Sequence, residues 1–160
     1  MLQSSTIART LDGVQTDVLI QTFADRIIVL VTQLGKVGSL IEASMPSTMP
    51  LLPAPPPDAA QPNERPLPVP PPSLQLTPLL GSAPTERMQT LHSLYASQIA
   101  TLVWTLEEAS VLEADRRPVV VGVALAKSTS EPAQSSELSP HDRTVFRGVM
   151  EIVRELLERR

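Results

Sequence analysis

Two clusters in this 160-residue chain contain residue types that carry out chemistry in other proteins. Gly35-Lys36-Val37-Gly38-Ser39 has the glycines and lysine of a phosphate-binding loop. Such a loop needs a longer glycine-framed stretch, a lysine followed directly by serine or threonine, and then a helix. Here valine follows Lys36 and the next residues have strand character. The segment therefore predicts a turn between two strands, in which the glycines supply positive φ.

The second cluster, Ser139, His141 and Asp142, has the residue types of a hydrolytic triad. A triad is assembled across a fold beside an oxyanion hole, whereas neighbours on one helical turn point in different directions. Serine, then proline, then an acidic residue three positions after the serine is instead a helix-capping pattern. The chain has no cysteine, and His92 sits at the edge of an apolar stripe, as a partly buried histidine does. We assign no catalytic residue, cofactor or metal ligand, and expect no enzyme.

Most of the 17 prolines fall between Pro46 and Pro84. Their density predicts a disordered, solvated insertion at about 46–72 that samples extended polyproline conformations. Within it, Arg65, Pro68 and Pro71 have the spacing of a basic residue and two prolines that docks into SH3 grooves. Any proline-rich insertion with an arginine produces such matches by chance, so a neutral insertion is the simpler interpretation.

The elements that must position these residues follow from periodicity. Asp12-Gly13 is a strong hairpin signal, and apolar residues from Met88 to Leu106 recur at steps of three and four. Trp104 lies opposite that stripe, which indicates either an ordinary exposed aromatic residue, a contact for a client protein, or a platform for the prolines. Strands are predicted at 3–11, 14–24, 27–31, 39–45, 74–80 and 119–126, and helices from Pro84 and from Pro140.

This order of elements predicts one α+β domain over residues 1–160. We expect an antiparallel meander sheet of about six strands with two helices, and a flexible loop at about 127–138. Two strands, Ile27–Val31 and Val119–Ala126, are apolar throughout, whereas antiparallel strands usually alternate. Each side chain left in water would forfeit roughly 1.5–3 kcal/mol. One helix on each face, a folded-back sheet, or a second chain would supply the cover.

Charge and composition indicate which partners and which cellular compartment to expect. The net charge is −4, with arginine and glutamate interspersed, so a nucleic acid partner is not expected. No apolar run approaches the roughly 20 residues that span a bilayer, and the first residues do not resemble a signal peptide. The absence of cysteine fits a reducing compartment. We therefore expect a cytoplasmic protein, with the nucleus as a second location.

The segment Phe23–Ser39 carries a resemblance. In it an apolar strand leads into Thr-Gln, an apolar residue and then Gly-Lys-x-Gly, which resembles the most recognisable stretch of the proteasome assembly chaperone 3 family. Asp12–Thr16, Leu79-Leu80-Gly81, Val119–Lys127 and the C-terminal helix fit the family in the same order. The resemblance covers nearly the whole chain except the proline-rich insertion and the loop at 127–138.

The resemblance implies an α+β fold that dimerises by facing its sheets, with the helices outside. It implies a partner like proteasome assembly chaperone 4, or a second copy of the chain, and a pair that helps proteasome α subunits join into the 20S ring. The candidates for the dimer interface are Ile28, Leu30, Val119, Val121 and Val123. The candidates for contact with an α subunit are Lys36, Val37 and Trp104. The alternative is a small dimerising adaptor that presents Arg65, Pro68 and Pro71 to an SH3 domain.

Overall fold

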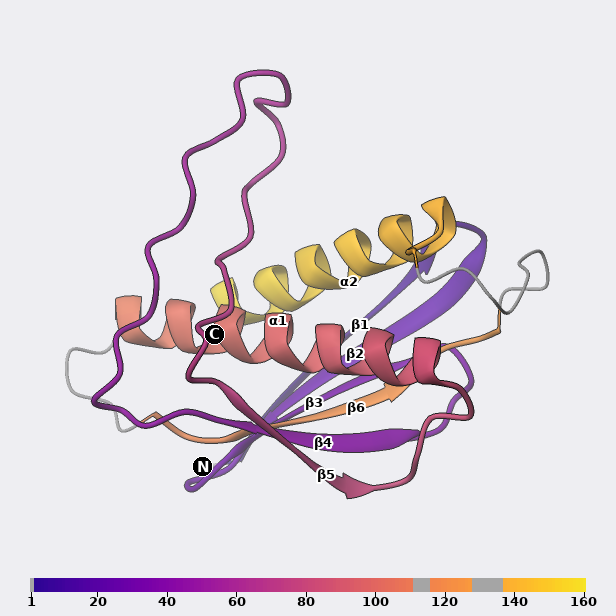
Figure 1. The fold of residues 1–160 in the computed structure, drawn as a ribbon, viewed down its shortest axis with the longest axis horizontal. Coiled ribbons are helices and arrows are strands. Elements are labelled where there is room, and N and C mark those ends of the chain that lie inside the picture. Colours follow the sequence, from indigo (N-terminus) through magenta and orange to yellow (C-terminus); the bar gives the residue numbers. More distant parts are fainter. Residues whose placement is uncertain (1, 111–115, 128–136) are drawn as a thin grey trace.

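The computed structural model describes residues 2–110, 116–127 and 137–160 and has the predicted α+β class, with six strands and two helices (Figure 1). Most of the loop predicted at 127–138 lies outside the described residues. The elements in chain order are β1 (Gln3–Leu11), β2 (Val14–Thr22), β3 (Ile27–Thr32), β4 (Ser39–Ser44), β5 (Gln75–Leu80), α1 (Glu86–Ser110), β6 (Val119–Ala124) and α2 (Pro140–Glu158).

The strands form one sheet in the order β1-β2-β3-β6-β4-β5. The predicted antiparallel meander is correct for β1, β2 and β3 but wrong beyond them. β6 lies between β3 and β4, parallel to β3 and antiparallel to β4. Parallel neighbours need a long crossover connection, and the chain between β3 and β6 includes α1, which supplies one. The sheet is therefore mixed.

Local signals set the ends of several elements. Asp12 and Gly13 both have positive φ, 47° and 80°, as the predicted two-residue hairpin requires. Helix α2 begins with the predicted capping box: the Asp142 N–H donates to Ser139 Oγ at 3.0 Å, and the Ser139 N–H donates to the Asp142 carboxylate. Helix α1 begins at Glu86 rather than Pro84, because the Thr85 hydroxyl accepts the N–H of Met88 at 3.2 Å and caps the helix.

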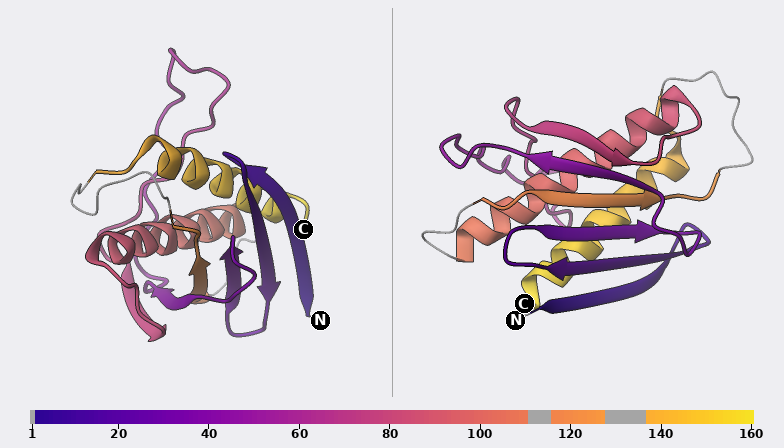
Figure 2. Two further views of the ribbon diagram at one scale, coloured as in Figure 1. Left: turned by 90° about the vertical axis from the view of Figure 1, so that its right-hand side faces the viewer. Right: turned by 90° about the horizontal axis from the view of Figure 1, so that it is seen from below.

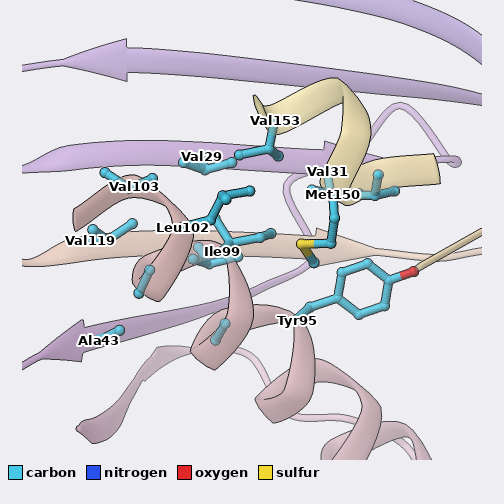
Figure 3. Close-up of a cluster of buried hydrophobic side chains, with 14 of the residues drawn as sticks. Val29, Val31, Ala43, Tyr95, Ile99, Leu102, Val103, Val119, Met150 and Val153 are labelled. Atoms are coloured by element: carbon cyan, nitrogen blue, oxygen red, sulfur yellow. The ribbon is translucent and has the colours of Figure 1, made fainter. Parts of the chain in front are cut away.

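Both helices lie on one face of the sheet, so that the molecule has two layers (Figure 2). The core between the layers joins alternate residues of the central strands to the apolar stripes of α1 and α2. Val29 and Val31 of β3 point toward Ile99 and Leu102 of α1 and Met150 of α2 (Figure 3), and all five are at most 2% exposed. This single layer of helices leaves the opposite face of the sheet without a helix over it in the described residues (Figure 2).

Residues 46–74, all of which the structure describes, form neither helix nor strand, as predicted. Their middle part projects from the molecule, and residues 66–74, here called the return limb, come back against the helices (Figure 1). The Gln98 side chain donates to the Pro68 carbonyl at 2.7 Å, and Arg154 donates to the Pro66 carbonyl at 3.1 Å. Because Pro68 and Pro71 are buried, the return limb differs from the solvated insertion that proline density predicts.

Candidate interaction surface

The face of the sheet turned away from the helices, here called the open face, is the candidate functional site. In Figure 2 both helices are on the far side of the strands when the molecule is seen from below, and no described helix covers the near side. Successive side chains of a strand point to opposite faces. On β3, Ile27, Val29 and Val31 are buried beneath the helices, whereas Ile28 and Leu30 are half-buried and lie on the open face.

Strand register lines up leucines across the open face. Leu19 of β2 is the partner of Leu30, Leu30 is the partner of Gly122, and Gly122 is the partner of Leu40. Leu40 is in turn the partner of Leu80 on the edge strand β5, where the Leu80 residue is 65% exposed. We call these four leucines, with Gly122 at their centre, the leucine row. It crosses five of the six strands.

Gly122 lets the leucine row close into a continuous surface. A Cβ atom at this position would lie 2.6 Å from Leu30 Cδ2, closer than carbon atoms approach, and 3.1 Å from both Leu40 Cδ2 and the Val37 carbonyl oxygen, which is tighter than most real contacts. The two leucines therefore lean over the glycine from either side. This is a close-approach glycine, since its role is to leave room for neighbouring side chains.

A second row runs beside the leucines. At the centre of this row, Ile28 of β3 pairs with Val120 of β6. Gln21 of β2 pairs with Ile28 on one side, and Glu42 of β4 pairs with Val120 on the other. The open face therefore has an apolar middle and polar residues toward its margins. Specific protein interfaces have this arrangement, with an apolar core and a polar rim. Leu19, Ile28, Leu30 and Leu40 are half-buried, Leu80 is exposed and Val120 is buried, so this apolar surface is partly accessible and is a candidate interaction site.

The loop at residues 33–38 adjoins the open face and is held rigidly at its start. The Thr32 hydroxyl accepts the N–H groups of Leu34 at 3.2 Å and Lys36 at 3.1 Å. The Gln33 side chain donates to the Thr16 hydroxyl at 3.1 Å and accepts the Ala126 N–H at 3.0 Å. These four bonds give the Thr-Gln dipeptide a structural role.

The far end of the same loop depends on Gly38. Its φ is 69°, and a Cβ there would lie 2.1 Å from the Val123 carbonyl oxygen, so only glycine fits. The segment is a turn leading into β4, as predicted, and not a phosphate loop. It leaves Lys36 exposed, with Leu34 and Val37 exposed by 52% and 46%. The predicted client contacts Lys36 and Val37 are thus accessible beside the open face.

The predicted dimer contacts divide between the two faces. Ile28 and Leu30 lie on the open face, but Val119, Val121 and Val123 are at most 1% exposed and belong to the core beneath the helices. The parallel register places these valines beside Ile27, Val29 and Val31. Their assignment to the interface is therefore wrong. Val120 lies on the other face of β6 and outside the core cluster, but it is only 5% exposed, so the half-buried Ile28 and Leu30 are the more accessible of these residues.

Trp104 is also misplaced by the sequence-based prediction, since it is 1% exposed rather than on the surface. Its indole N–H donates to the Arg117 carbonyl at 2.8 Å, and the Arg116 guanidinium lies 5.8 Å from the ring centroid. Arg116 also donates to the Pro46 and Met49 carbonyls at 2.6 and 2.8 Å. Residues on both sides of α1 in sequence thus cover Trp104, which rules it out as a surface contact for a client.

The residues of the SH3-type motif do not form an accessible ligand. Arg65 pairs with Glu158 of α2 at 2.5 Å, while Pro68 and Pro71 are buried in the return limb. An SH3 groove must contact both prolines directly. The prediction that Arg65, Pro68 and Pro71 serve as a ligand is wrong for this conformation.

The triad residue types do not converge either. Ser139 and Asp142 bond to each other's backbone at the start of α2, and Asp142 also pairs with Arg87 at 2.5 Å. His141 points elsewhere, with Nδ1 2.5 Å from the Asp12 carboxylate in the β1–β2 hairpin. All three therefore have structural partners. Within the described residues, neither helix is long and apolar enough to cross a membrane.

Sequence reasoning missed Leu19, Leu40, Leu80 and Val120. A signal existed for Leu19, because the short turn between β2 and β3 fixes the register that sets it opposite Leu30. Leu40, Leu80 and Val120 join the surface only through the placement of β6 between β3 and β4, which no local pattern encodes.

Comparisons with known proteins do not assign the chain to a family. A scan against protein-family models gave no match, and a search of curated proteins gave no significant match.

Proposed function

We propose that this chain is a non-enzymatic chaperone that assists assembly of the 20S proteasome α ring. It acts as a dimer, either with a related subunit like proteasome assembly chaperone 4 or with a second copy of itself. The observation that carries the proposal is the open face, on which the leucine row and the Ile28–Val120 pair form a continuous apolar surface. A second chain would take this surface out of water, at a gain of roughly 25 cal/mol per Å² of apolar area.

Two adjoining surfaces would have different roles, the open face in binding the partner chaperone and the loop at residues 33–38 in binding an α subunit. The open face is broad and apolar, which suits a lasting contact with the partner chaperone. The loop at residues 33–38 is narrow and carries exposed Leu34, Lys36 and Val37 on a backbone fixed by Thr32 and Gly38. A small preorganised contact of mixed chemistry suits transient binding of an α subunit. The mechanism needs neither ATP nor a metal ion, and we place it in the cytoplasm and nucleus.

The family resemblance supports the identity of the partners, whereas the packing argument supports only the need for cover. Thr32, Gln33 and Gly38 belong to the segment that resembles the family, and each has a physical role in holding the loop. The adaptor alternative has no comparable support, because Pro68 and Pro71 are buried.

Paired substitutions test this assignment. Leu30→Asp should abolish dimer formation on co-expression with the related subunit, because it places a charge in the middle of the apolar surface. Leu52→Asp is the matched control, since Leu52 is exposed by 41% in the proline-rich segment away from the open face. Val37→Asp should leave the dimer intact while reducing recovery of proteasome α subunits in a pull-down. Recovery of neither chaperone nor α subunits with the wild-type chain would contradict the proposal.

A further inference from the structure

His92 lies at a cavity that the proposed function does not use. It stands in the first turns of α1 and is 5% exposed, and neither ring nitrogen has a hydrogen-bond partner among the described residues. The cavity has a volume of about 290 Å³ and opens between α1 and the β4–β5 edge of the sheet. Its walls include Ile41 and Leu76 from the strands, Ser82 from the following loop, and Gln89 and Ser93 beside His92 on α1.

The state of the His92 ring follows from its surroundings. Burial lowers the pKa of His92 below its ordinary value of 6.5, because the charged imidazolium would lose its hydration. The ring is therefore neutral near pH 7, with one nitrogen that donates a hydrogen bond and one that accepts. Buried polar atoms in native proteins are nearly always paired, so two unpaired ring nitrogens at a cavity point to a missing partner.

The lining of the cavity limits what that partner is. It contains no lysine, arginine, aspartate or glutamate, so it offers no charge to balance an ionic ligand. His92 is the only lining residue of the types that commonly bind metals, and the described residues contain no group of three such side chains that could hold a metal ion. The volume lies at the low end of the roughly 300–1,000 Å³ typical of small-molecule sites, which excludes a nucleotide-sized ligand.

We propose that this cavity binds a neutral carboxamide side chain, glutamine or asparagine, of an extended polypeptide lying along the β5 edge of the sheet. A carboxamide both donates and accepts, so it pairs with the His92 ring and with the hydroxyls of Ser82 and Ser93, while its methylene groups contact Ile41 and Leu76. The cavity shares Leu40 with the leucine row, but His92, Ser82 and Ser93 lie outside that row, and the proposal does not depend on the chaperone function.

The position of the cavity favours a polypeptide over a free small molecule. β5 is an edge strand, and Leu79 and Leu80 at its end, exposed by 48% and 65%, stand in the sequence between Pro78 and Gly81, which line the cavity. These leucines offer apolar contacts to residues flanking the inserted side chain. Pro78 has no backbone N–H, so a bound polypeptide cannot pair continuously with β5. Insertion of a side chain into the cavity is then the main source of specificity for the polypeptide.

Nitrogen-15 NMR of the two histidine rings in the full chain tests the proposal. The probe is N-acetylglutamine methylamide, compared with the charged N-acetylglutamate and the apolar N-acetylnorleucine methylamides. We expect the glutamine probe to shift the His92 ring nitrogens and the backbone amides of Ser82, Gln89 and Ser93. The ring of His141, which lies on α2 beside Asp12, is the internal control and should not respond.

The specificity of the response decides the outcome. We expect both comparison probes to bind at least about tenfold more weakly than the glutamine probe, and His92→Leu to remove its preference, because buried polar groups reject ligands that leave them unpaired. No shift at any accessible probe concentration would overturn the proposal. Equal shifts with the norleucine probe would also overturn it, since the cavity would then be only an apolar pocket, as would a protonated His92 ring at pH 7. The wild-type spectra decide these points even if His92→Leu fails to fold.

Discussion

The two faces of the central sheet are built from the same residue types but have different surroundings. On the helix face, Val29 and Val121 are completely buried against α1 and α2. On the open face, Leu30 is half-buried, and Val120, although 5% exposed, lies outside the core cluster beneath the helices. Strands that are apolar throughout have two apolar faces, and the helices of the described residues cover one of them. The difference separates residues that hold the fold from residues that the proposal assigns to a partner.

Substitutions of two neighbouring residues of β3 should show the largest difference in stability between the two faces. Val29→Asp should unfold the chain, because an unpaired carboxylate in the core costs about 4 kcal/mol or more. Leu30→Asp should cost the isolated chain only about 1 kcal/mol, because the aspartate reaches water. Urea unfolding followed by circular dichroism measures both variants. Equal loss of stability would mean that the open face is covered within the chain.

Substitution of Trp104, on α1 in the helix layer, should have the next largest effect on the free energy of unfolding. Trp104→Ala should destabilise the chain by about 3–5 kcal/mol, as large-to-small changes in a core do. Trp104→Phe keeps most of the packing but loses the bond to the Arg117 carbonyl, so it should cost about 1–2 kcal/mol. Thermal unfolding of both variants checks this order. If Trp104→Ala lowered the free energy of unfolding by less than about 0.5 kcal/mol, Trp104 would be exposed, as helical periodicity predicts, and not buried.

Gly122→Ala probes the open face with a single added methyl group. The new Cβ would meet Leu30 Cδ2 and Leu40 Cδ2, so the leucine row must part. The leucine methyl groups can move aside, whereas the Val37 carbonyl oxygen, 3.1 Å from the new Cβ, belongs to the backbone, so the isolated chain should lose about 1–3 kcal/mol. Binding to the partner should weaken as well, since the two surfaces no longer match. Calorimetric titration with the partner measures the loss of affinity, and Leu52→Ala, at an exposed position away from the open face, is the control that should leave the affinity unchanged.

His92→Leu should have the smallest effect and should stabilise the chain. Near pH 7 the substitution removes two unpaired buried nitrogens, which is worth about 1 kcal/mol. Because folding lowers the pKa of His92, the unfolded chain binds a proton more readily. The wild-type stability that depends on neutral His92 is therefore present above pH 6.5 and decreases as the pH falls from there through the lower pKa of the folded state.

The same substitution removes this pH dependence, so the stability gain of His92→Leu should grow as the pH is lowered from 7 toward 5. Urea unfolding of the wild type and the variant at several pH values measures the difference. A variant less stable than the wild type throughout this range would show that the ring nitrogens have partners in solution.

Local patterns predict much of the fold. Asp12-Gly13 forms its hairpin, Ser139 and Asp142 form their capping box, and Val145, Val149, Ile152 and Leu156 form the buried stripe of α2. Each of these features depends on residues a few positions apart, which sequence periodicity and turn chemistry describe directly.

The surface itself was only partly predictable. A strand that is apolar throughout does not alternate, so its sequence cannot assign faces. The prediction that Val119, Val121 and Val123 lie at an interface is wrong for this reason. The faces of β6 are set by its parallel pairing with β3, a long-range choice. Trp104 was misplaced because its cover comes from Arg116 and Arg117, whose approach to α1 is a tertiary contact.

The mass of the chain in solution, alone and co-expressed with a subunit like proteasome assembly chaperone 4, tests the central claim most directly. The account predicts a dimer in at least one of these conditions, and dissociation of that dimer by Leu30→Asp but not by Leu52→Asp. A stable wild-type monomer in both conditions would contradict the claim that a second chain covers the leucine row.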